Sequence, residues 1–244
     1  MISASLYDTL TIECIGPVAL VTLRRAQQLN AMNKYMQAEI TSTFELLSDD
    51  PDVRVIVVTD DGRAFMAGAD IKEYATQSGP EFDIFQEKAA RMYAAIEGNS
   101  KPVIAAVNGF ALGGGFEGPV LRHRHHFDAC QGLSAGDQTR VGAGWRRYAA
   151  KFQKLGRNRA NFLLMTGDIV PDSEFVSVGL VNEIVALDAL LPHAMEMAAM
   201  IATEPGDTVE GLKRLTRIAL VGDLADGLAQ ERALVCHLYR TEIA

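Results

Sequence analysis

Apolar and polar positions along the first half of the chain predict short strands separated by helices. Two apolar runs separated by Gly16-Pro17 predict a β-hairpin. Two further runs repeat their apolar positions at helical spacing, and each ends at turn-forming residues. The predicted strands are residues 6–14, 18–23 and 53–59, and the predicted helices are residues 36–47 and 82–97. Strands that alternate with helices in this way predict an α/β fold with largely parallel pairing.

The second half of the chain has a different pattern, with apolar positions at helical spacing almost throughout. The predicted helices are residues 158–166, 172–178, 190–202, 208–221 and 224–239. The chain therefore combines an α/β part with a C-terminal helical part.

Residues 103–117, VIAAVNGFALGGGFE, are a buried apolar run followed by three glycines and a carboxylate. This order predicts a strand that turns sharply into a helix start, whose first amides can bind an anion or polarise a carbonyl oxygen. Glu117, one turn further on, is placed to act as an acid or base beside that oxygen. A glycine-rich turn that is needed only for close packing is the alternative interpretation.

A second segment, residues 64–72 (AFMAGADIK), follows the predicted strand 53–59. Together with LNAMN at 29–33 and GLVNEIV at 179–185, these motifs resemble the enoyl-CoA hydratase/isomerase (crotonase) superfamily, hydratase branch. The resemblance covers about residues 6–117 and 156–241.

The resemblance implies a spiral of ββα units over residues 1–190 and a helical oligomerisation region over residues 191–244, which builds trimers, often paired into hexamers. It also implies an acyl-CoA thioester substrate, of which coenzyme A is a part, and no separate cofactor or metal. The expected activity is hydration of a 2-trans-enoyl-CoA to 3-hydroxyacyl-CoA, in fatty-acid or related acyl-CoA degradation. An enoyl-CoA isomerase is a weaker alternative.

Site residues are carried over from the family by position. The matching oxyanion-hole amides are those of Ala69 and Gly114, and the matching catalytic acid–base is Glu117. The positions that match the lining of the adenine and pantetheine path are Ala31, Ala67, Asp70, Ile71 and Lys72. A strand-to-loop turn with a solvated aspartate and lysine is the competing interpretation for this last group.

Charge and composition narrow the classes of partner. A net charge of −8 argues against a nucleic-acid-binding surface and against a basic face for membranes. No apolar run approaches the length of a membrane-spanning helix, and Met1 is not followed by the pattern of a signal peptide. Three widely spaced cysteines indicate a reducing compartment. We therefore expect a soluble, cytoplasmic protein.

The middle block, residues 118–153, departs from the rest of the sequence. It contains three of the five histidines, the only tryptophan, and six basic residues against two acidic ones. A histidine metal cluster or a phosphate-binding loop is a minor possibility, because no carboxylate or cysteine completes a metal geometry.

A slip of reading frame is the favoured explanation of the middle block. With suitable codons and one base removed, 135–140 can read Pro-Glu-Ile-Lys-Leu-Gly, and 143–150 can read Pro-Gly-Gly-Gly-Gly-Thr-Gln-Arg. The hydratase branch carries these strings, in this order, after its GGGFE segment. The alternative is a genuinely divergent insertion.

The first of these strings holds the family's second catalytic glutamate, which this chain lacks; Asp137 is a coincidental carboxylate. A non-catalytic remnant that binds coenzyme A or only self-assembles is therefore the alternative to an active hydratase. The resemblance also implies a further helical turn and a basic tail beyond Thr241, so the C-terminus is expected to be short.

If the middle block keeps the written sequence, burial of its charged residues would be costly. We therefore expect it to pack weakly, to be strained, or to be displaced to the surface. The flanking segments, 103–117 and 156–185, are expected to be well packed.

Overall fold

The computed structural model describes residues 7–111, 124–127, 156–166, 176–177 and 181–243, and every structural statement below concerns these residues. The strands are β1 (Leu10–Ile15), β2 (Val18–Leu23), β3 (Val55–Asp60), β4 (Val103–Val107), β5 (Arg124–Phe127) and β6 (Glu183–Val185). The helices are η1 (Ala26–Gln28), α1 (Lys34–Asp49), α2 (Ile71–Tyr74), α3 (Gly79–Gly98), α6 (Arg157–Thr166), α8 (Leu187–Ala202), α9 (Gly206–Val221), α10 (Leu224–Leu238) and η4 (Tyr239–Ile243).

The strands form one sheet in the order β1-β2-β3-β4-β5-β6. β1 and β2 are the predicted antiparallel hairpin, and each later strand pairs in parallel with the strand before it. Parallel neighbours need a crossover between them, and helices supply the first two crossovers. The predicted α/β class with largely parallel pairing is confirmed.

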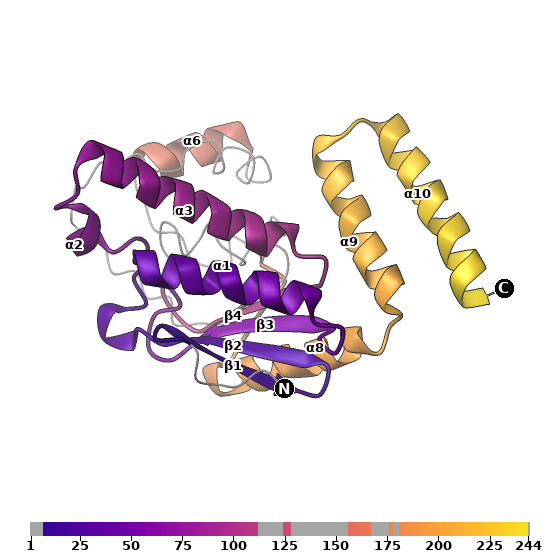
Figure 1. Cartoon of the computed structure of the whole chain (residues 1–244), viewed down its shortest axis with the longest axis horizontal. Helices are drawn as coiled ribbons and strands as arrows, with labels where there is room; N and C mark the ends of the chain where they lie inside the picture. The colour runs from indigo at the N-terminus through magenta and orange to yellow at the C-terminus, as the bar shows by residue number, and fades with distance from the viewer. Residues whose placement is uncertain (1–6, 112–123, 128–155, 167–175, 178–180, 244) are drawn as a thin grey trace.

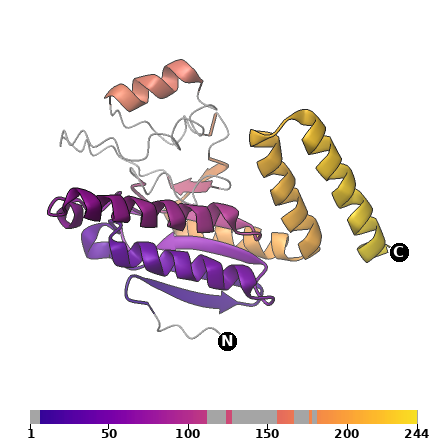
Figure 2. The same cartoon turned by 45° about the horizontal axis from the view of Figure 1, so that its top comes forward.

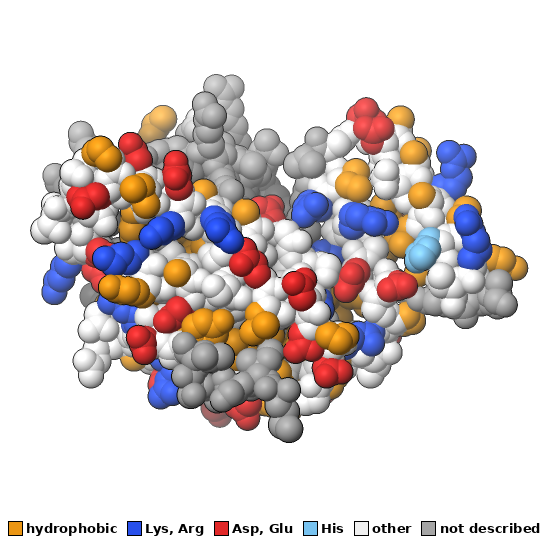
Figure 3. Space-filling model, viewed as in Figure 1, with side chains coloured by type: hydrophobic (Ala, Val, Ile, Leu, Met, Phe, Trp, Pro, Cys, Tyr) orange, Lys and Arg blue, Asp and Glu red, His pale blue; other side chains and the backbone are white. Residues whose placement is uncertain are grey.

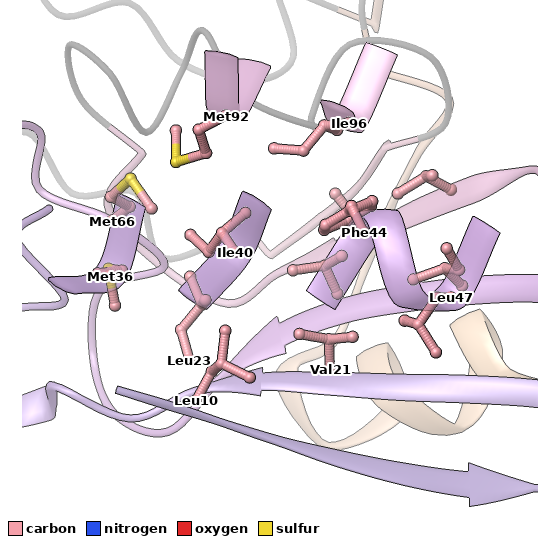
Figure 4. Packing of buried hydrophobic residues seen from close by; sticks show 14 of the residues in the cluster. Leu10, Val21, Leu23, Met36, Ile40, Phe44, Leu47, Met66, Met92 and Ile96 are labelled. Atoms are coloured by element: carbon pink, nitrogen blue, oxygen red, sulfur yellow. The ribbon is translucent and has the colours of Figure 1, made fainter. Parts of the chain in front are cut away.

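Helices cover both faces of the sheet (Figure 1). On one face, α1 and α3 lie side by side and contribute Phe44 and Met92 to a core that includes Ile56 of β3. Figure 4 shows these helices packing their apolar side chains against the strands. On the other face, Ala194 of α8 packs against Val57 and its neighbours. Alternate residues of β3 therefore enter opposite cores, as a strand buried on both faces requires.

A unit of strand, bridge and helix repeats along the chain. After β2, Met32 forms a parallel bridge to Ala69 and the chain enters α1. After β3, Met66 and Ala69 form bridges before the chain enters α2 and α3, and after β4 Ala111 is the bridge partner of Met66. The bridges form a small second layer beside the main sheet, which is the ββα arrangement expected from the resemblance.

The α9–α10 pair stands to one side of the sheet and its covering helices (Figures 1 and 2). Lys213 of α9 donates from Nζ to the Lys101 carbonyl at 2.5 Å, and Arg54 donates to the Glu204 carbonyl. The expected boundary between residues 190 and 191 falls inside α8, which packs on the sheet. The part that leaves the sheet is α9 and α10.

Capping residues determine where the helices begin and end more closely than the spacing of apolar residues does. α3 begins at Gly79, three residues before the predicted start, because Ser78 and Glu81 form a capping box and Pro80 occupies the first turn. The Ser78 backbone N donates to Glu81 Oε2 at 2.8 Å. α1 ends at Asp49 and α3 at Gly98, two residues and one residue after the predicted ends at 47 and 97.

Of the expectations for the second half, the one for segment 156–185 is wrong, and the one for the middle block is tested only at residues 124–127. β5 pairs between β4 and β6, so these four residues of the middle block are not displaced from the sheet. Their backbone groups join the ladder whatever the side chains are. The rest of the block, its side chains and its strain lie outside the described residues. Segment 156–185 is not uniformly well packed, since Phe162 and Met165 on α6 are 47% and 83% exposed. Val103–Val107 is buried throughout, as expected.

Charges of both signs intermingle over the face of the molecule seen in Figure 3. Among the helices that the structure describes, none is both long and apolar enough to cross a membrane.

Candidate active site

Three chain segments meet beyond the carboxyl ends of β2, β3 and β4. The first is residues 29–32, the second is residues 61–70, and the third is residues 108–111. In open parallel sheets, ligands bind in the crevice outside the carboxyl ends of the strands. This edge is therefore where a site is expected from the fold alone.

The second segment lies between the other two. On one side, Ala67 N donates to the Leu29 carbonyl at 3.0 Å and Met32 N donates to the Gly68 carbonyl at 2.7 Å. On the other side, Met66 N donates to the Phe110 carbonyl at 3.0 Å. The three segments are thus held together by backbone hydrogen bonds.

The amide of Ala69 is left free by this arrangement. Met32 pairs with the residues on either side of Ala69, since Asp70 N also donates to the Met32 carbonyl, at 2.9 Å. In a parallel bridge of this kind, the N–H of the middle residue points away from the partner strand. Ala69 N–H therefore points to the side on which Phe110 lies, and within the described chain it has no hydrogen-bond acceptor. Ala69 is half-buried, so the amide can be reached.

Close approach of the backbones fixes this geometry. A side-chain Cβ at Gly109 would lie 2.2 Å from the Arg63 carbonyl oxygen, so only glycine allows the third segment to approach the second so closely. Gly68, with a φ of 106°, adopts a backbone conformation that side chains disfavour. Gly68 immediately precedes Ala69, and Gly109 lets the third segment approach the second at Arg63.

Arg25, just after β2, binds two of the residues that were predicted to line the adenine and pantetheine path. Its guanidinium lies 3.0 Å from the Asp70 carboxylate, with side-chain exposures of 16% and 17%, and it also donates to the Ala31 carbonyl. Asp70 is thus engaged in a partly buried ion pair rather than solvated. This arrangement fixes the start of α2, for which Asp70 is the N-cap residue.

A cluster of polar side chains, part of it buried, lies at the same edge of the sheet. The Asn30 side chain accepts from Arg25 N at 2.7 Å and donates to the Ala64 carbonyl at 2.8 Å. Asn30 Nδ2 is 3.5 Å from Asp60 Oδ2, at the end of β3. Asn108 donates to the Gly62 carbonyl at 3.0 Å. Burial, the main cause, raises the pKa of the Asp60 carboxyl to about 7.

The structure brings together six of the eight predicted site residues. Ala31, Ala67, Ala69 and Asp70 lie in the first and second segments, and Ile71 and Lys72 are exposed at the start of α2. Gly114 and Glu117 lie outside the described residues, three and six positions after the bridge residue Ala111.

Sequence reasoning missed the polar side chains that support the site, Arg25, Asn30, Asp60 and Asn108. Asn30 lies inside the LNAMN motif, where a buried asparagine between apolar residues was an available signal. The other three follow directly on strands that were predicted. The carboxyl ends of parallel strands meet at one edge, so their proximity could have been inferred.

A parallel sheet with ββα units, and a backbone amide at its carboxyl edge that has no acceptor within the described residues, define an α/β protein with a candidate site at this edge. The chain belongs to the enoyl-CoA hydratase/isomerase family, whose model matches residues 14–120 and 139–243. It is 34% identical over 203 residues to the crotonyl-CoA hydratase of Syntrophomonas wolfei, covering 81% of this chain and 77% of that protein. It is 31% identical over 243 residues to the short-chain-enoyl-CoA hydratase of Clostridium acetobutylicum, covering 96% and 91%.

Solved structures agree with this assignment. The enoyl-CoA hydratase of Bacillus anthracis superposes with a TM-score of 0.87 at 26% identity, covering 96% of this chain and 92% of the other. The crotonase-like fold and the hydratase branch are therefore confirmed. The family match resumes at residue 139, earlier than position 156 where the motifs suggested, and the unmatched stretch 121–138 lies inside the middle block.

Proposed function

We propose that this chain is an enoyl-CoA hydratase that adds water across the double bond of a 2-trans-enoyl-CoA thioester. The observation that carries the proposal is the free Ala69 amide, directed toward the segment that leads to Gly114 and Glu117. The similarity to hydratases over most of the chain supports the same activity.

In the reaction that we propose, the protein binds and polarises the substrate at its thioester oxygen. The amides of Ala69 and Gly114 donate to this oxygen, and the electron density that moves onto it makes Cβ electrophilic. A donor of this kind typically contributes about 3–4 kcal/mol to transition-state stabilisation. Water oxygen bonds to Cβ as one proton of that water passes to an acid–base group, and a proton is added at Cα, so the double bond becomes a single bond. Glu117 is the acid–base group that we assign to these proton transfers.

The coenzyme A part of the substrate is proposed to follow the exposed start of α2. Ile71 and Lys72 are exposed there, and Ala31 and Ala67 are half-buried beside it. The ion pair of Asp70 with Arg25 gives this surface a fixed backbone. No cofactor is proposed, since coenzyme A enters with the substrate.

We also propose assembly into a homotrimer or hexamer through α9 and α10. Leu212 on α9 and Leu224, Leu228, Val235 and Tyr239 on or beside α10 are each more than half exposed in the single chain. An exposed apolar surface of this kind is typical of a protein–protein contact. Sedimentation analysis of wild-type protein and of a Leu228→Glu variant tests it, with a monomeric wild-type chain as the contradicting outcome.

A catalytically impaired chain that still binds acyl-CoA is the second candidate. It is favoured by one observation, that stretch 121–138 is unmatched by the family. The first of the two reread strings, at 135–140, which would carry the second glutamate, begins inside this stretch. The written chain offers Asp137 there instead.

Hydration of crotonyl-CoA, followed by loss of its conjugated-thioester absorbance, separates the two candidates. Glu117→Gln is expected to lower turnover at least about 100-fold, because general acid–base groups contribute about 10²–10⁴ in rate. Binding of the thioester should change little. The matched control is Glu87→Gln, an exposed glutamate on α3, which should leave turnover unchanged. A wild-type chain that binds crotonyl-CoA without hydrating it supports the impaired candidate, and equal turnover in Glu117→Gln removes Glu117 from the mechanism.

A further inference from the structure

Asp60 is a buried carboxyl that the proposed reaction does not use. It is the last residue of β3 and is 8% exposed. Asn30 Nδ2 lies 3.5 Å from its Oδ2, the limit of a hydrogen bond, and the Asn108 side chain also lies against it. Among the described residues, no donor reaches Asp60 Oδ1, and none reaches Asn108 Oδ1. Two buried oxygens at the same place therefore lack a donor.

Protonation of the Asp60 carboxyl removes this lack of hydrogen-bond donors. A buried carboxylate with few donors is costly, and a buried carboxylic acid is not. The acid also has an O–H group, which can donate to the neighbouring Asn108 side chain. The raised pKa of Asp60, about 7, agrees with this, since burial outweighs the lowering by Asn108 and the like charge of Asp61 adds to it.

The other charged groups around Asp60 do not neutralise it. The Arg24 guanidinium pairs with Asp61 at 3.7 Å, where both side chains are more than half exposed. The Arg25 guanidinium is directed to Asp70 and to the Ala31 carbonyl. Arg63 is exposed, and its carbonyl faces Gly109. Within the part of the chain that the structure describes, the groups that meet the Asp60 carboxyl itself are the side-chain amides of Asn30 and Asn108.

The three side chains connect the segments on either side of the free amide. Asn30 lies in the first segment, in which Met32 pairs with the residues on either side of Ala69. The Asn30 side chain also donates to the Ala64 carbonyl of the second segment. Asn108 binds the Gly62 carbonyl and precedes Phe110, which accepts from Met66. Asp60 lies where the two asparagines meet. A change in its hydrogen bonding would therefore act on both sides of residue 69.

We propose that Asp60 works as a neutral carboxylic acid and as a positioning residue. With Asn30 and Asn108 it holds the two segments that flank Ala69, so that the Ala69 amide stays directed at the thioester oxygen. The inference deepens the proposed function and rests on it. Ionisation of Asp60 loosens this arrangement, so the site works best below neutral pH.

The protonation state is tested by unfolding, which needs no substrate. An acid with a pKa near 7 when folded and about 3.9 when unfolded binds one more proton in the folded state between these values. The unfolding equilibrium constant should then rise up to about tenfold per pH unit from about pH 4.5 to 6.5, relative to Asp60→Asn, which cannot ionise. Equal pH dependence in wild type and Asp60→Asn overturns the neutral acid.

The positioning role is tested with a conjugated, chromophoric enoyl-CoA thioester, whose absorption band shifts to the red when donors polarise its carbonyl. We expect the shift in wild type to fall as pH rises through 7, and the shift in Asp60→Asn to be independent of pH. Asp60→Ala should lose most of the shift and lower kcat at least tenfold with little change in KM, while Asp60→Asn rescues both. Asp61→Asn is the matched control and should keep the red shift and kcat of wild type at low pH. Because the like charge of Asp61 raises the pKa of Asp60, the red shift of this variant should fall at a slightly lower pH than that of wild type.

A full red shift in folded Asp60→Ala overturns the positioning role alone. A wild-type chain that binds no enoyl-CoA thioester overturns the proposed function as well as this inference, and the two failures are thus distinguished.

Discussion

Buried polar groups have hydrogen-bond partners at the amino end of the β3–β4 strand pair, whereas some at its carboxyl end have none within the described chain. At the amino end, the Lys101 side chain is buried and its Nζ donates to the Leu47 carbonyl at 2.6 Å and to the Asp50 carbonyl. Asn99 adds a hydrogen bond to the Phe44 carbonyl at 2.9 Å. Lys101 thus satisfies carbonyl groups at and just beyond the C-terminus of α1, where a helix leaves them unpaired, and Asn99 adds a hydrogen bond to a carbonyl earlier in the same helix.

At the carboxyl end, buried or half-buried polar groups of the described chain lack partners. Asp60 Oδ1 and Asn108 Oδ1 have no donor there, and Ala69 N–H has no acceptor. At the amino end the donors named above have acceptors, whereas at the carboxyl end the proton and the ligand that we propose would supply the missing partners. Buried side-chain atoms without a partner also occur within the described chain on Gln37 and Thr43 of α1, so it is the combination of such atoms with the Ala69 amide that marks the carboxyl end as the candidate site.

The largest effect is expected at the carboxyl end from Gly109→Ala. Its Cβ would lie 2.2 Å from the Arg63 carbonyl oxygen, so backbone must shift, at a cost of about 3 kcal/mol in the free energy of unfolding. Urea denaturation measures this cost. The matched control is Gly98→Ala at the end of α3, where a Cβ meets nothing within 4 Å. Similar stability of both variants would show that the third segment is not held as closely as described.

At the amino end, Lys101→Met should lower the free energy of unfolding by about 2 kcal/mol. Methionine keeps the apolar stem, but the carbonyls of Leu47 and Asp50 lose a charged donor. Because this end is a support, kcat of the remaining folded protein should be unchanged. Lys88→Met, on the exposed side of α3, is the control and should be neutral. A selective loss of kcat in Lys101→Met would contradict the division between the two ends.

Arg25→Met is expected to have an intermediate effect, about 1–2 kcal/mol in stability, since it leaves the Asp70 carboxylate and the Ala31 carbonyl without their donor. Both partners lie on the proposed coenzyme A surface, so the Kd of an acyl-CoA thioester should rise more than kcat falls. Calorimetric titration measures the Kd. An unchanged Kd would place the coenzyme A path elsewhere.

The smallest effect is expected from Asp61→Asn, which removes an exposed ion pair with Arg24. Exposed pairs of this kind contribute at most about 1 kcal/mol, and less at high salt. The difference in unfolding midpoint between this variant and wild type should vanish in concentrated salt. A loss as large as that of Lys101→Met would contradict the contrast between exposed and buried groups.

Strong periodicity is the reason that the strands and helices of the first half could be predicted. Ile56 and Val57 of β3 lie on opposite faces of the sheet, as successive residues of a strand do. Their orientation could therefore be predicted without knowing which strands pair with β3. The motifs also predicted the Ala69 amide as part of the site. Its role stays a prediction, as do those of Gly114 and Glu117.

The sequence allowed the supporting side chains to be placed at the carboxyl edge of the sheet, but their burial could not be predicted, because it depends on pairing across the chain. Asp60 and Asp61 are equivalent in a TDDG sequence that is typical of a turn. The side chain of Asp60 is buried and that of Asp61 is exposed because β3 runs one residue further than its apolar run, in register with Leu23 of β2. The charges around β5 suggested displacement, but strand pairing is made by the backbone.

The position of α8 has a consequence for synthesis of the chain. Strands β1 to β4 pair with their sequence neighbours, and α1 and α3 cover one face by residue 98, so this layer can assemble as it leaves the ribosome. The opposite face, with Val57 and Ile104 on it, is covered by α8, which begins at Leu187. At a synthesis rate of about 5–20 residues per second, this apolar face is open for several seconds in every nascent chain. We expect the chaperones that bind nascent chains to contact this apolar face during that interval.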